Sequence, residues 1–328
     1  MFKFNTALSL EDLPSPPPGK TGWPWTQQSQ PLPERIPDGS QWPRISIVTP
    51  SYNQGQFIEE TIRSVLLQGY PNLKYIIIDG GSTDQSVEII KKYGKYLTYW
   101  VSEPDKGQSH ALNKGIGMTT GDIFTFLNSD DLLAPNVLAR VARYFGKNID
   151  TLVLCGGFRE IDRDGRTLRE KIKIPAITWD DLVLVKTYQP QPGTFWRTQV
   201  FSEIGQFRED LHYYFDQEFF IRLLMKYRLE TLQGIFAYPR IYQETKSQSN
   251  SPDIVKERHN TILEFLPKVK GKLFSKLLTY RFVKLTYVGN HIISMPTNKL
   301  KKIFESMNNP ILWSSPTFIK KLFLNQTN

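Results

Sequence analysis

The sequence contains a single cysteine and no long apolar run. With Cys155 alone an internal disulfide is excluded, which is typical of proteins that stay in a reducing compartment. A membrane-spanning helix needs about 18 consecutive apolar residues, which the sequence does not contain, and the mean hydropathy is −0.37. Residues 1–20 also lack the pattern of a secretion signal. We therefore expect a cytoplasmic protein.

Acidic residues are scarce in residues 255–328. This segment has three acids against thirteen Lys and Arg, so the net charge of +9 belongs to it and not to the whole chain. The rest of the chain is close to neutral, and we expect no nucleic-acid partner. The segment combines its lysines with Phe, Leu and Ile, as amphipathic helices on an anionic membrane do. We favour such a peripheral association, at the inner face of a membrane, over packing on the folded domain or pairing with another subunit.

The composition divides the 328 residues into three segments. Residues 1–43 form a Pro-rich leader, whose prolines favour extended backbone. Three tryptophans in this leader predict that it packs along a folded surface. Residues 44–250 alternate between strand and helix patterns, and residues 251–328 form a basic tail with helical patterns broken by proline and glycine. One main domain with two appendages agrees with the length.

The pattern from residue 44 onward is typical of an α/β fold. Short β-branched or apolar runs predict buried strands, and amphipathic segments between them predict helices. Ser82 and Gln85 have the spacing of a capping box at one helix start. This alternation implies a parallel sheet with helices on both faces. We expect strands at residues 45–49, 75–78, 98–101, 123–127 and 152–155, a hairpin turn at 162–165, and helices at 56–68, 82–93, 108–116, 135–145 and 215–227.

Acidic residues follow three of the predicted strands. They are Asp79, Asp105 and the adjacent pair Asp130 and Asp131. Open α/β sheets bind their ligands at the carboxyl ends of the strands. Carboxylates there can hold a divalent metal against a diphosphate, accept hydrogen bonds from a nucleoside or act as a general base. Asp is also an ordinary loop and capping residue, but three such positions at one sheet edge indicate a nucleotide site.

Three motifs in this domain resemble those of family-two glycosyltransferases of the GT-A fold. They are ISIVTPSYN at residues 45–53, IDGGSTD at 78–84 and LNSDD at 127–131, in the order and spacing of that family. The resemblance covers about residues 43–245. It implies an α/β fold of the GT-A (Rossmann-like) type, in which a mixed, mainly parallel sheet is flanked by helices.

The resemblance also assigns ligands to the two halves of the domain. Residues 44–131 would bind the nucleotide-sugar donor, and residues 132–250 would bind the acceptor. The family's Asp-X-Asp motif, which ligates metal and diphosphate, corresponds to Asn128, Ser129 and Asp130. Because Asn128 stands where the family has Asp, Asp130 becomes the main candidate ligand for Mg²⁺ or Mn²⁺. The other candidates for donor nucleotide binding are Thr49, Pro50, Tyr52, Asp79, Gln108, Asn113 and Lys114.

Two acids at the start of the predicted helix at 215–227 resemble the family's source of the catalytic base. We expect Asp216 to be the base, with Glu218 as the second candidate; capping of the helix is the structural alternative. Trp196 is expected either on the acceptor side, where it could stack on a sugar ring, or in the core. Asp131 could likewise cap the helix that follows the acidic turn.

These assignments predict an inverting glycosyltransferase of polysaccharide biosynthesis. Its base would deprotonate a hydroxyl of a glycan or lipid-linked saccharide, which then displaces the nucleoside diphosphate from the anomeric carbon with metal assistance. Two alternatives remain. One is a nucleotidyltransferase that makes nucleotide-sugars, although its Gly-rich basic signature is missing after the first strand. The other is a non-catalytic nucleotide-sugar or glycan-binding protein, which Asn128 makes conceivable.

Overall fold

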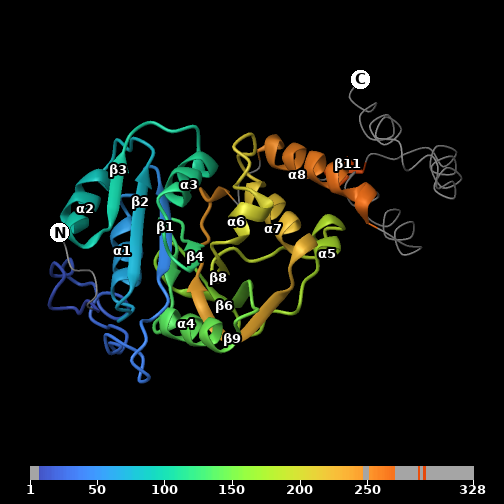
Figure 1. Cartoon of the computed structure of the whole chain (residues 1–328). Coiled ribbons are helices and arrows are strands. Elements are labelled where there is room, and N and C mark those ends of the chain that lie inside the picture. Colours follow the sequence, from blue (N-terminus) through green and yellow to red (C-terminus); the bar gives the residue numbers. More distant parts are fainter. Residues whose placement is uncertain (1–6, 247–250, 270–286, 289–290, 293–328) are drawn as a thin grey trace, which may run out of the picture. The chain divides into compact units, whose positions relative to one another are not determined.

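The computed structural model describes residues 7–246, 251–269, 287–288 and 291–292 of the chain (Figure 1). By its contacts the chain divides into two compact units. The first comprises Met1–Ala176 and Pro190–Asn250, and the second comprises Ile177–Gln189 and Ser251–Asn328. The predicted leader therefore belongs to the same unit as the α/β domain.

The first half of the large unit is a parallel sheet with helices around it (Figure 1). Its strands pair in the order β3-β2-β1-β4, and the central ones are buried over most of their length, which explains their continuous apolar sequence. The predicted alternation of strands and helices is confirmed. The elements are β1 (Ile45–Ser51), α1 (Ile58–Leu66), β2 (Leu73–Asp79), α2 (Ser86–Tyr93), the 3-10 helix η1 (Gly94–Tyr96), β3 (Tyr99–Ser102), α3 (Gln108–Gly117) and β4 (Ile123–Phe126).

One helix begins later than the sequence predicts. Ser82 was expected to cap it, but α2 starts at Ser86. The Ser82 hydroxyl and backbone N–H instead donate to the Asp79 carboxylate, at 2.6 and 2.9 Å. The predicted capping box of Ser82 and Gln85 is therefore wrong, because Ser82 is used to build the loop at the carboxyl end of β2.

The second half of the large unit extends the same sheet with mixed strand directions. The order continues from β4 through β8, β6 and β9 to β5, and β7 pairs with β6. The pairs β4–β8, β6–β8, β6–β7 and β5–β9 are antiparallel, whereas β6–β9 is parallel. The predicted turn at 162–165 connects β6 to β7, as expected. The elements are β5 (Leu132–Leu133), α4 (Val137–Lys147), β6 (Val153–Ile161), β7 (Thr167–Lys171), β8 (Thr194–Arg197), α6 (Val200–Ile204), α7 (Phe215–Lys226) and β9 (Leu229–Tyr238).

The Pro-rich leader packs on the α/β domain through a buried arginine. Arg63, on α1, is fully buried and donates hydrogen bonds to the backbone carbonyls of Pro14, Pro24 and Trp25. The side chains of Trp25 and Trp42 are buried as well. The predicted packing of the leader on a folded surface is confirmed. A guanidinium suits this place because its fork of N–H groups can satisfy several carbonyls of a chain that lacks regular structure.

Among its described residues, the small unit contains helices and a short pair of strands. The elements are α5 (Trp179–Val183), α8 (Pro252–Phe265), the 3-10 helix η3 (Leu266–Lys268) and the strand pair β10 (Tyr287–Val288) and β11 (His291–Ile292). Helix α8 agrees with the helical patterns expected in the basic tail, most of whose later residues lie outside the described part of the chain. None of the helices that the structure describes has the length and apolar character needed to cross a membrane.

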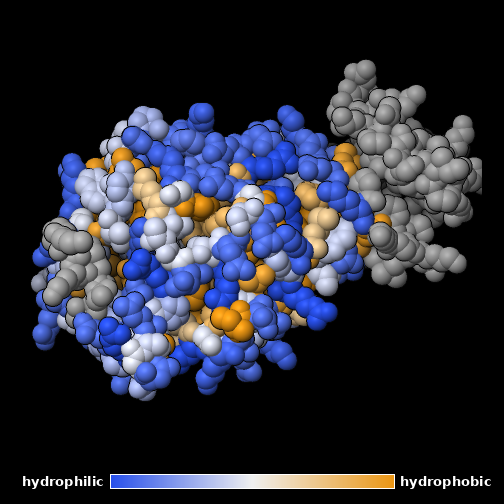
Figure 2. Space-filling view, in the orientation of Figure 1, coloured by the Kyte–Doolittle hydropathy of each residue, from blue (hydrophilic) through white to orange (hydrophobic). Residues whose placement is uncertain are grey.

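The visible face of the molecule is mostly hydrophilic, with apolar residues in small separate patches (Figure 2). Scattered apolar residues are normal on a folded surface. The polar groups at the carboxyl ends of β1, β2 and β4 therefore carry more information about function than the apolar surface does.

Candidate functional site

Asp79 organises the loop at the carboxyl end of β2. Its carboxylate is fully buried, and its Oδ2 accepts hydrogen bonds from Gly81 N, Ser82 N and Ser102 Oγ at 3.2, 2.9 and 2.7 Å. Its Oδ1 accepts the bond from Ser82 Oγ. Several donors at one carboxylate fix its position in the loop. Asp79 thus fixes the shape of the loop, and its contact with a nucleoside remains a prediction.

The loop after β1 is joined to the loop after β2 by four hydrogen bonds. Asn53, at a left-handed φ of 51°, donates from its backbone to Ser82 Oγ at 2.7 Å. Asn tolerates this conformation better than most residues. The other three bonds are Thr83 N to Asn53 Oδ1 (2.9 Å), Gln54 N to Ser86 Oγ (2.9 Å) and Gly55 N to Asp84 Oδ2 (2.8 Å). These bonds give the site a rigid edge.

The predicted nucleoside ligands on β1 differ in exposure. Tyr52 is 63% exposed, so its ring is accessible at the carboxyl end of the strand. Pro50 is buried. Thr49 is fully buried, and its hydroxyl lies 3.0 Å from the Tyr75 hydroxyl. The side chain of Thr49 is therefore a core group, and the contact of this residue with a nucleoside remains a prediction.

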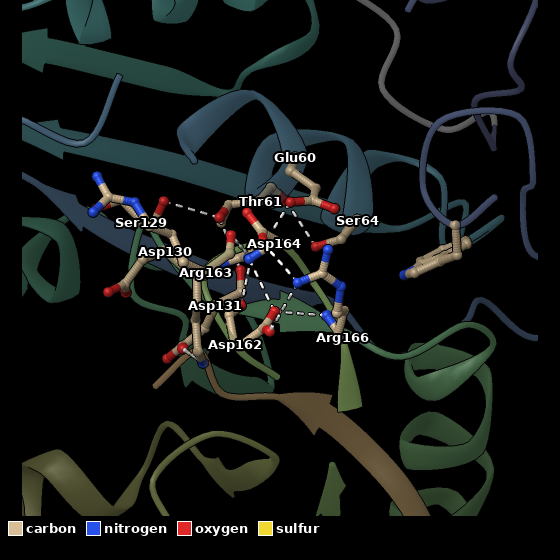
Figure 3. A network of polar contacts seen from close by, with 12 residues as sticks. Glu60, Thr61, Ser64, Ser129, Asp130, Asp131, Asp162, Arg163, Asp164 and Arg166 are labelled. Atoms are coloured by element: carbon tan, nitrogen blue, oxygen red, sulfur yellow. Dashed lines mark hydrogen bonds and ion pairs between the residues drawn. The ribbon is translucent and has the colours of Figure 1, made fainter. Parts of the chain in front are cut away.

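The acidic turn follows β4, as predicted, and is held from two helices. Thr61, on α1, donates its hydroxyl to the backbone carbonyls of Ser129 and Asp131 (3.0 and 2.8 Å). Gln108, the first residue of α3, donates from Nε2 to Asn128 Oδ1 at 2.7 Å. The structure thus brings Gln108, Asn128, Ser129 and Asp130 together. Figure 3 shows the turn beside α1 and the 162–166 hairpin turn.

Arg240, which no sequence motif predicted, supports the acidic turn from behind. Its backbone N–H donates to Asp131 Oδ1 at 2.8 Å, and its Nε donates to the carbonyl of Asp130 at 2.9 Å. The guanidinium, 1% exposed, also donates to Glu60 at 2.7 Å and to the carbonyls of Asp162 and Arg163 at 3.1 and 2.9 Å. One arginine therefore joins the turn to α1 and to the hairpin between β6 and β7.

The two carboxylates of the turn differ in their environment. Burial raises the pKa of Asp130, while a hydrogen bond of 3.0 Å from the Tyr242 hydroxyl acts in the opposite direction. Burial and the nearby charge of Asp130 raise the pKa of Asp131 well above its ordinary value. Both Asp131 oxygens accept hydrogen bonds, Oδ1 from Arg240 and Oδ2 from Asn128 at 3.2 Å. Asp131 is thus part of the scaffold of the turn and not a cap of α4, which begins at Val137.

These residues fit a divalent metal only in combination with a substrate. Within the described part of the chain, no three His, Cys, Asp or Glu side chains gather as a ready-made metal site. Mg²⁺ is commonly bound by one or two carboxylates together with substrate phosphates and water. Asp130 can supply one carboxylate, whereas Asp131 is engaged and the Asn128 oxygen accepts from Gln108. The turn is therefore compatible with a single-carboxylate site for Mg²⁺ or Mn²⁺.

Asp216 has the properties of a general base. It lies in the first turn of α7, where Gln217 N donates to its Oδ1 at 2.7 Å. Burial raises the pKa of Asp216 to about 6, and the charge of Lys246 is among the effects that oppose this shift. A carboxylate with a pKa near the working pH can both take and release a proton. The contact with Gln217 N also satisfies a backbone donor of the helix start, so basic and capping roles are compatible.

Glu218, the second candidate base, is engaged elsewhere. It is 1% exposed and forms a bidentate ion pair with Arg222, at 2.7 and 2.8 Å. Arg222 also donates to the backbone carbonyls of Ile204 and Gln206. A buried carboxylate paired in this way cannot reach a substrate hydroxyl. The prediction of a second base at Glu218 is wrong, because Glu218 anchors the loop after α6.

Asn113 and Lys114 also make contacts within the protein. The Asn113 amide accepts from Phe207 N at 3.1 Å and donates to Phe207 O and Glu209 Oε1 at 2.9 and 3.0 Å. Both ends of the amide are occupied, so Asn113 fixes the segment before α7, and its contact with the donor remains a prediction. Lys114 forms an ion pair with Glu103 at the surface. Its contact with a phosphate remains a prediction.

Trp196 belongs to the core and not to the acceptor site. The residue is fully buried, and its ring packs against Phe124 and Phe219 with centroid distances of 5.2 and 5.5 Å. Phe126 and Phe201 extend this aromatic cluster. A side chain without exposed surface cannot stack on a sugar. The acceptor-side prediction is therefore wrong, and the alternative of a core residue is confirmed.

The geometry described above coincides with a family assignment. The model of glycosyl transferase family 2 matches residues 46–224, which is more than half of the chain. The chain belongs to glycosyl transferase family 2. This family-2 match confirms the resemblance of the three motifs, and it includes the acidic turn and Asp216.

Curated relatives of this family-2 chain are themselves uncharacterized glycosyltransferases. One from Rickettsia typhi is 30% identical over 194 residues, which are 56% of this chain and 59% of the relative. One from Mycobacterium tuberculosis is 32% identical over 184 residues, 55% of this chain and 68% of the relative. The chain spans only 36% to 59% of the length of the first Rickettsia relatives.

Solved structures confirm the GT-A fold of this family-2 member. The structure of S. aureus TarS 1-349 in complex with UDP-GlcNAc has a TM-score of 0.60 at 18% identity, and the match covers 85% of this chain and 83% of that TarS 1-349 chain. The mannosyltransferase PcManGT from Pyrobaculum calidifontis, in complex with GDP-Man and Mn²⁺, has a TM-score of 0.53 at 16% identity, with coverage of 87% and 88%. At these identities the likeness concerns the fold.

Proposed function

We propose that the protein is an inverting glycosyltransferase that moves a sugar from a nucleoside diphosphate to a hydroxyl acceptor. The observation that carries the proposal is the presence of two candidate carboxylates, Asp130 and Asp216, in one family-2 domain. Asp130 lies in the acidic turn next to Asn128, and Asp216, whose pKa is raised by burial to about 6, lies at the start of α7. One carboxylate that can bind a cation and another that can take a proton are the groups that the proposed reaction needs.

In the proposed reaction Asp216 takes the proton of the acceptor hydroxyl. The hydroxyl oxygen forms a bond to the anomeric carbon, and the bond from that carbon to the diphosphate oxygen breaks with its electron pair. One displacement of this kind inverts the anomeric configuration. A divalent cation held by Asp130 would neutralise the charge of the departing nucleoside diphosphate. The rigid edge formed by the joined loops after β1 and β2 would orient the nucleoside.

The substrate classes follow from the chemistry of the site. The TarS and PcManGT structures contain UDP-GlcNAc and GDP-Man, which supports a nucleotide-sugar donor for this chain. We propose a glycan or lipid-linked saccharide as acceptor, in polysaccharide biosynthesis at the cytoplasmic side of a membrane. The basic segment 255–328 supports peripheral association with an anionic surface. Flotation with anionic liposomes should be lost when this segment is removed, and unchanged flotation would contradict the membrane role.

The substitution Asp216→Asn tests the proposed base. It should abolish transfer while nucleoside diphosphate binding, measured by thermal shift, is retained. Asp210→Asn serves as the matched control, because Asp210 is exposed and paired with Arg208 at 2.6 Å. Normal turnover by the Asp216→Asn protein would rule out this base.

Product analysis separates the proposed function from its alternatives. Wild-type protein incubated with UDP- and GDP-sugars, Mn²⁺ and acceptor glycans should release the nucleoside diphosphate. In a parallel incubation with added pyrophosphate, its consumption with formation of a nucleoside triphosphate and a sugar 1-phosphate would instead indicate a nucleotidyltransferase. Donor binding without any product would indicate a binding protein.

A further inference from the structure

The segment after β9 passes along the whole candidate site. Arg240 lies behind the acidic turn, and the Tyr242 hydroxyl donates to Asp130 Oδ2. Thr245 donates its hydroxyl to the carbonyl of Tyr242 at 2.8 Å, which turns the chain back. Lys246 then reaches Gln108. Residues 240–246 therefore contact the backbone of the acidic turn, the Asp130 carboxylate and Gln108 at the start of α3.

The ammonium group of Lys246 lies between the donor and base sides of this site. Its Nζ donates to Gln108 Oε1 at 3.0 Å and to the carbonyl of His212 at 3.2 Å. The same Gln108 amide donates to Asn128 at 2.7 Å, so Lys246 is one side chain away from the acidic turn. The charge of Lys246 also acts on Asp216. Lys246 is thus placed where a diphosphate between the acidic turn and the base would lie.

The low negative charge of the acidic turn explains how a positive charge at Lys246 could assist binding of a diphosphate. Asn128 removes one negative charge from the place where a diphosphate approaches, and with it one potential metal ligand. A lysine that contributes a positive charge at the same place compensates for a weaker metal site, because both act on the charge of the leaving group. The Gln108 amide oxygen and the His212 carbonyl, both acceptors from Lys246, are neutral oxygens, which a phosphate oxygen can replace or join.

We propose that Lys246 binds the diphosphate of the donor and stabilises it as the leaving group. This inference rests on the proposed function and adds a residue to it. Because the ammonium meets the diphosphate and not the nucleoside, its contribution is confined to ligands that carry phosphate. Because it complements a single-carboxylate metal site, it contributes with and without a divalent cation.

Binding of phosphate-bearing and phosphate-free ligands tests this proposal. Lys246→Met and Lys246→Arg are compared with wild type for binding of UDP, GDP, uridine and guanosine by calorimetry, in EDTA and in Mn²⁺. Lys246→Met should weaken binding of the preferred nucleoside diphosphate about tenfold or more and leave its nucleoside unchanged. Lys246→Arg should retain most of the affinity, since the charge is kept. Lys226→Met is the matched control, because Lys226 pairs with Glu203 at the far end of α7.

The outcomes separate this inference from the proposed function. Equal binding of the nucleoside diphosphate by Lys246→Met and wild type would overturn the role of Lys246 alone. An equal loss for diphosphate and nucleoside would overturn it too, since it would indicate a structural effect. A wild-type protein that binds neither UDP nor GDP in Mn²⁺ would overturn the proposed function together with the inference. Retained nucleoside binding confirms that the variant is folded.

Discussion

Tyr242 donates a hydrogen bond of 3.0 Å from its hydroxyl to Oδ2 of Asp130, the main candidate metal ligand. Burial and the negative charge of Asp130 raise the pKa of Tyr242, so the phenol remains protonated and acts as a donor throughout the physiological pH range. Its ring packs on Phe57 with a centroid distance of 5.1 Å, which fixes its direction. The orientation of Asp130 therefore depends on a residue more than one hundred positions later in the chain.

The substitution Tyr242→Phe should weaken metal binding without loss of the fold. It removes the hydroxyl and keeps the ring on Phe57. Partners that orient a metal-binding carboxylate typically contribute about 10- to 100-fold to metal affinity. We expect a loss of at least about tenfold in apparent Mn²⁺ affinity, measured by calorimetry in the presence of UDP or GDP. Tyr99→Phe, which alters an exposed ring at the start of β3, is the control. An unchanged Mn²⁺ affinity in Tyr242→Phe would contradict a role in orienting Asp130.

The sequence predicted the parts of the site that follow local rules. Asp79 and Asp130 could be found because both end a strand with a strong apolar pattern, and the carboxyl ends of parallel strands meet at one edge. Asp216 could be found because it opens a well-marked helix. The donor half of the fold was predictable for the same reason, since each of its strands and helices carries its own pattern.

The missed and misassigned residues depend on contacts between distant segments. Arg240 and Lys246 lie after the last strand in a stretch without a motif, and only the fold brings them to the acidic turn. Trp196 was assigned to the acceptor side and Glu218 to a second base because they lie in segments that resemble those of the family. Their roles depend on burial and on partners elsewhere in the chain, which spacing in the sequence does not reveal.

The loss of Arg240 should be the most destabilising change at this site. Arg240→Met removes a buried guanidinium and leaves Glu60 and three backbone carbonyls without their donor. Breaking a buried ion pair by removing one partner typically costs about 3–5 kcal/mol, and we expect a decrease of that size in the free energy of unfolding by urea. Arg166→Met, which removes an exposed guanidinium paired with Asp164, should change it by less than about 1 kcal/mol. Similar values for the two variants would contradict the bridging role of Arg240.

Asp216 should make stability depend on pH in the direction opposite to an ordinary paired carboxylate. Its pKa is raised to about 6 in the folded state, so between pH 4 and pH 6 the folded protein binds more protons than the unfolded chain. Stability is then lost as the pH rises through this window. Asp216→Asn avoids this loss. Relative to wild type it should gain on the order of 2 kcal/mol in unfolding free energy between pH 4 and pH 8.

The control variant for this prediction, Asp210→Asn, should change stability with pH in the opposite direction. The ion pair with Arg208 lowers the pKa of Asp210, so its contribution to stability is present at neutral pH and lost in acid. Asp210→Asn should therefore lose stability relative to wild type as the pH rises from 3 to 8. Urea denaturation of both variants and wild type at a series of pH values measures the two slopes. A purely capping role of Asp216 predicts that Asp216→Asn is less stable than wild type at pH 8.

Asn128→Asp should give the acidic turn the carboxylate that the family has at this position, and it should lower the stability of the metal-free protein. The Asn128 amide now donates to Asp131 Oδ2 at 3.2 Å, and a carboxylate in its place would face Asp131 with a like charge. Without metal we therefore expect a lower melting temperature at pH 8. With Mn²⁺ and a nucleoside diphosphate the second carboxylate becomes a ligand, and we expect Mn²⁺ affinity to rise about tenfold or more. Asn148→Asp, which adds the same charge at the exposed end of α4, should change neither the Mn²⁺ affinity nor its stabilising effect. If Asn128→Asp binds Mn²⁺ no more tightly than wild type, the metal does not lie beside residue 128, and the assignment of the turn as the diphosphate site fails with it.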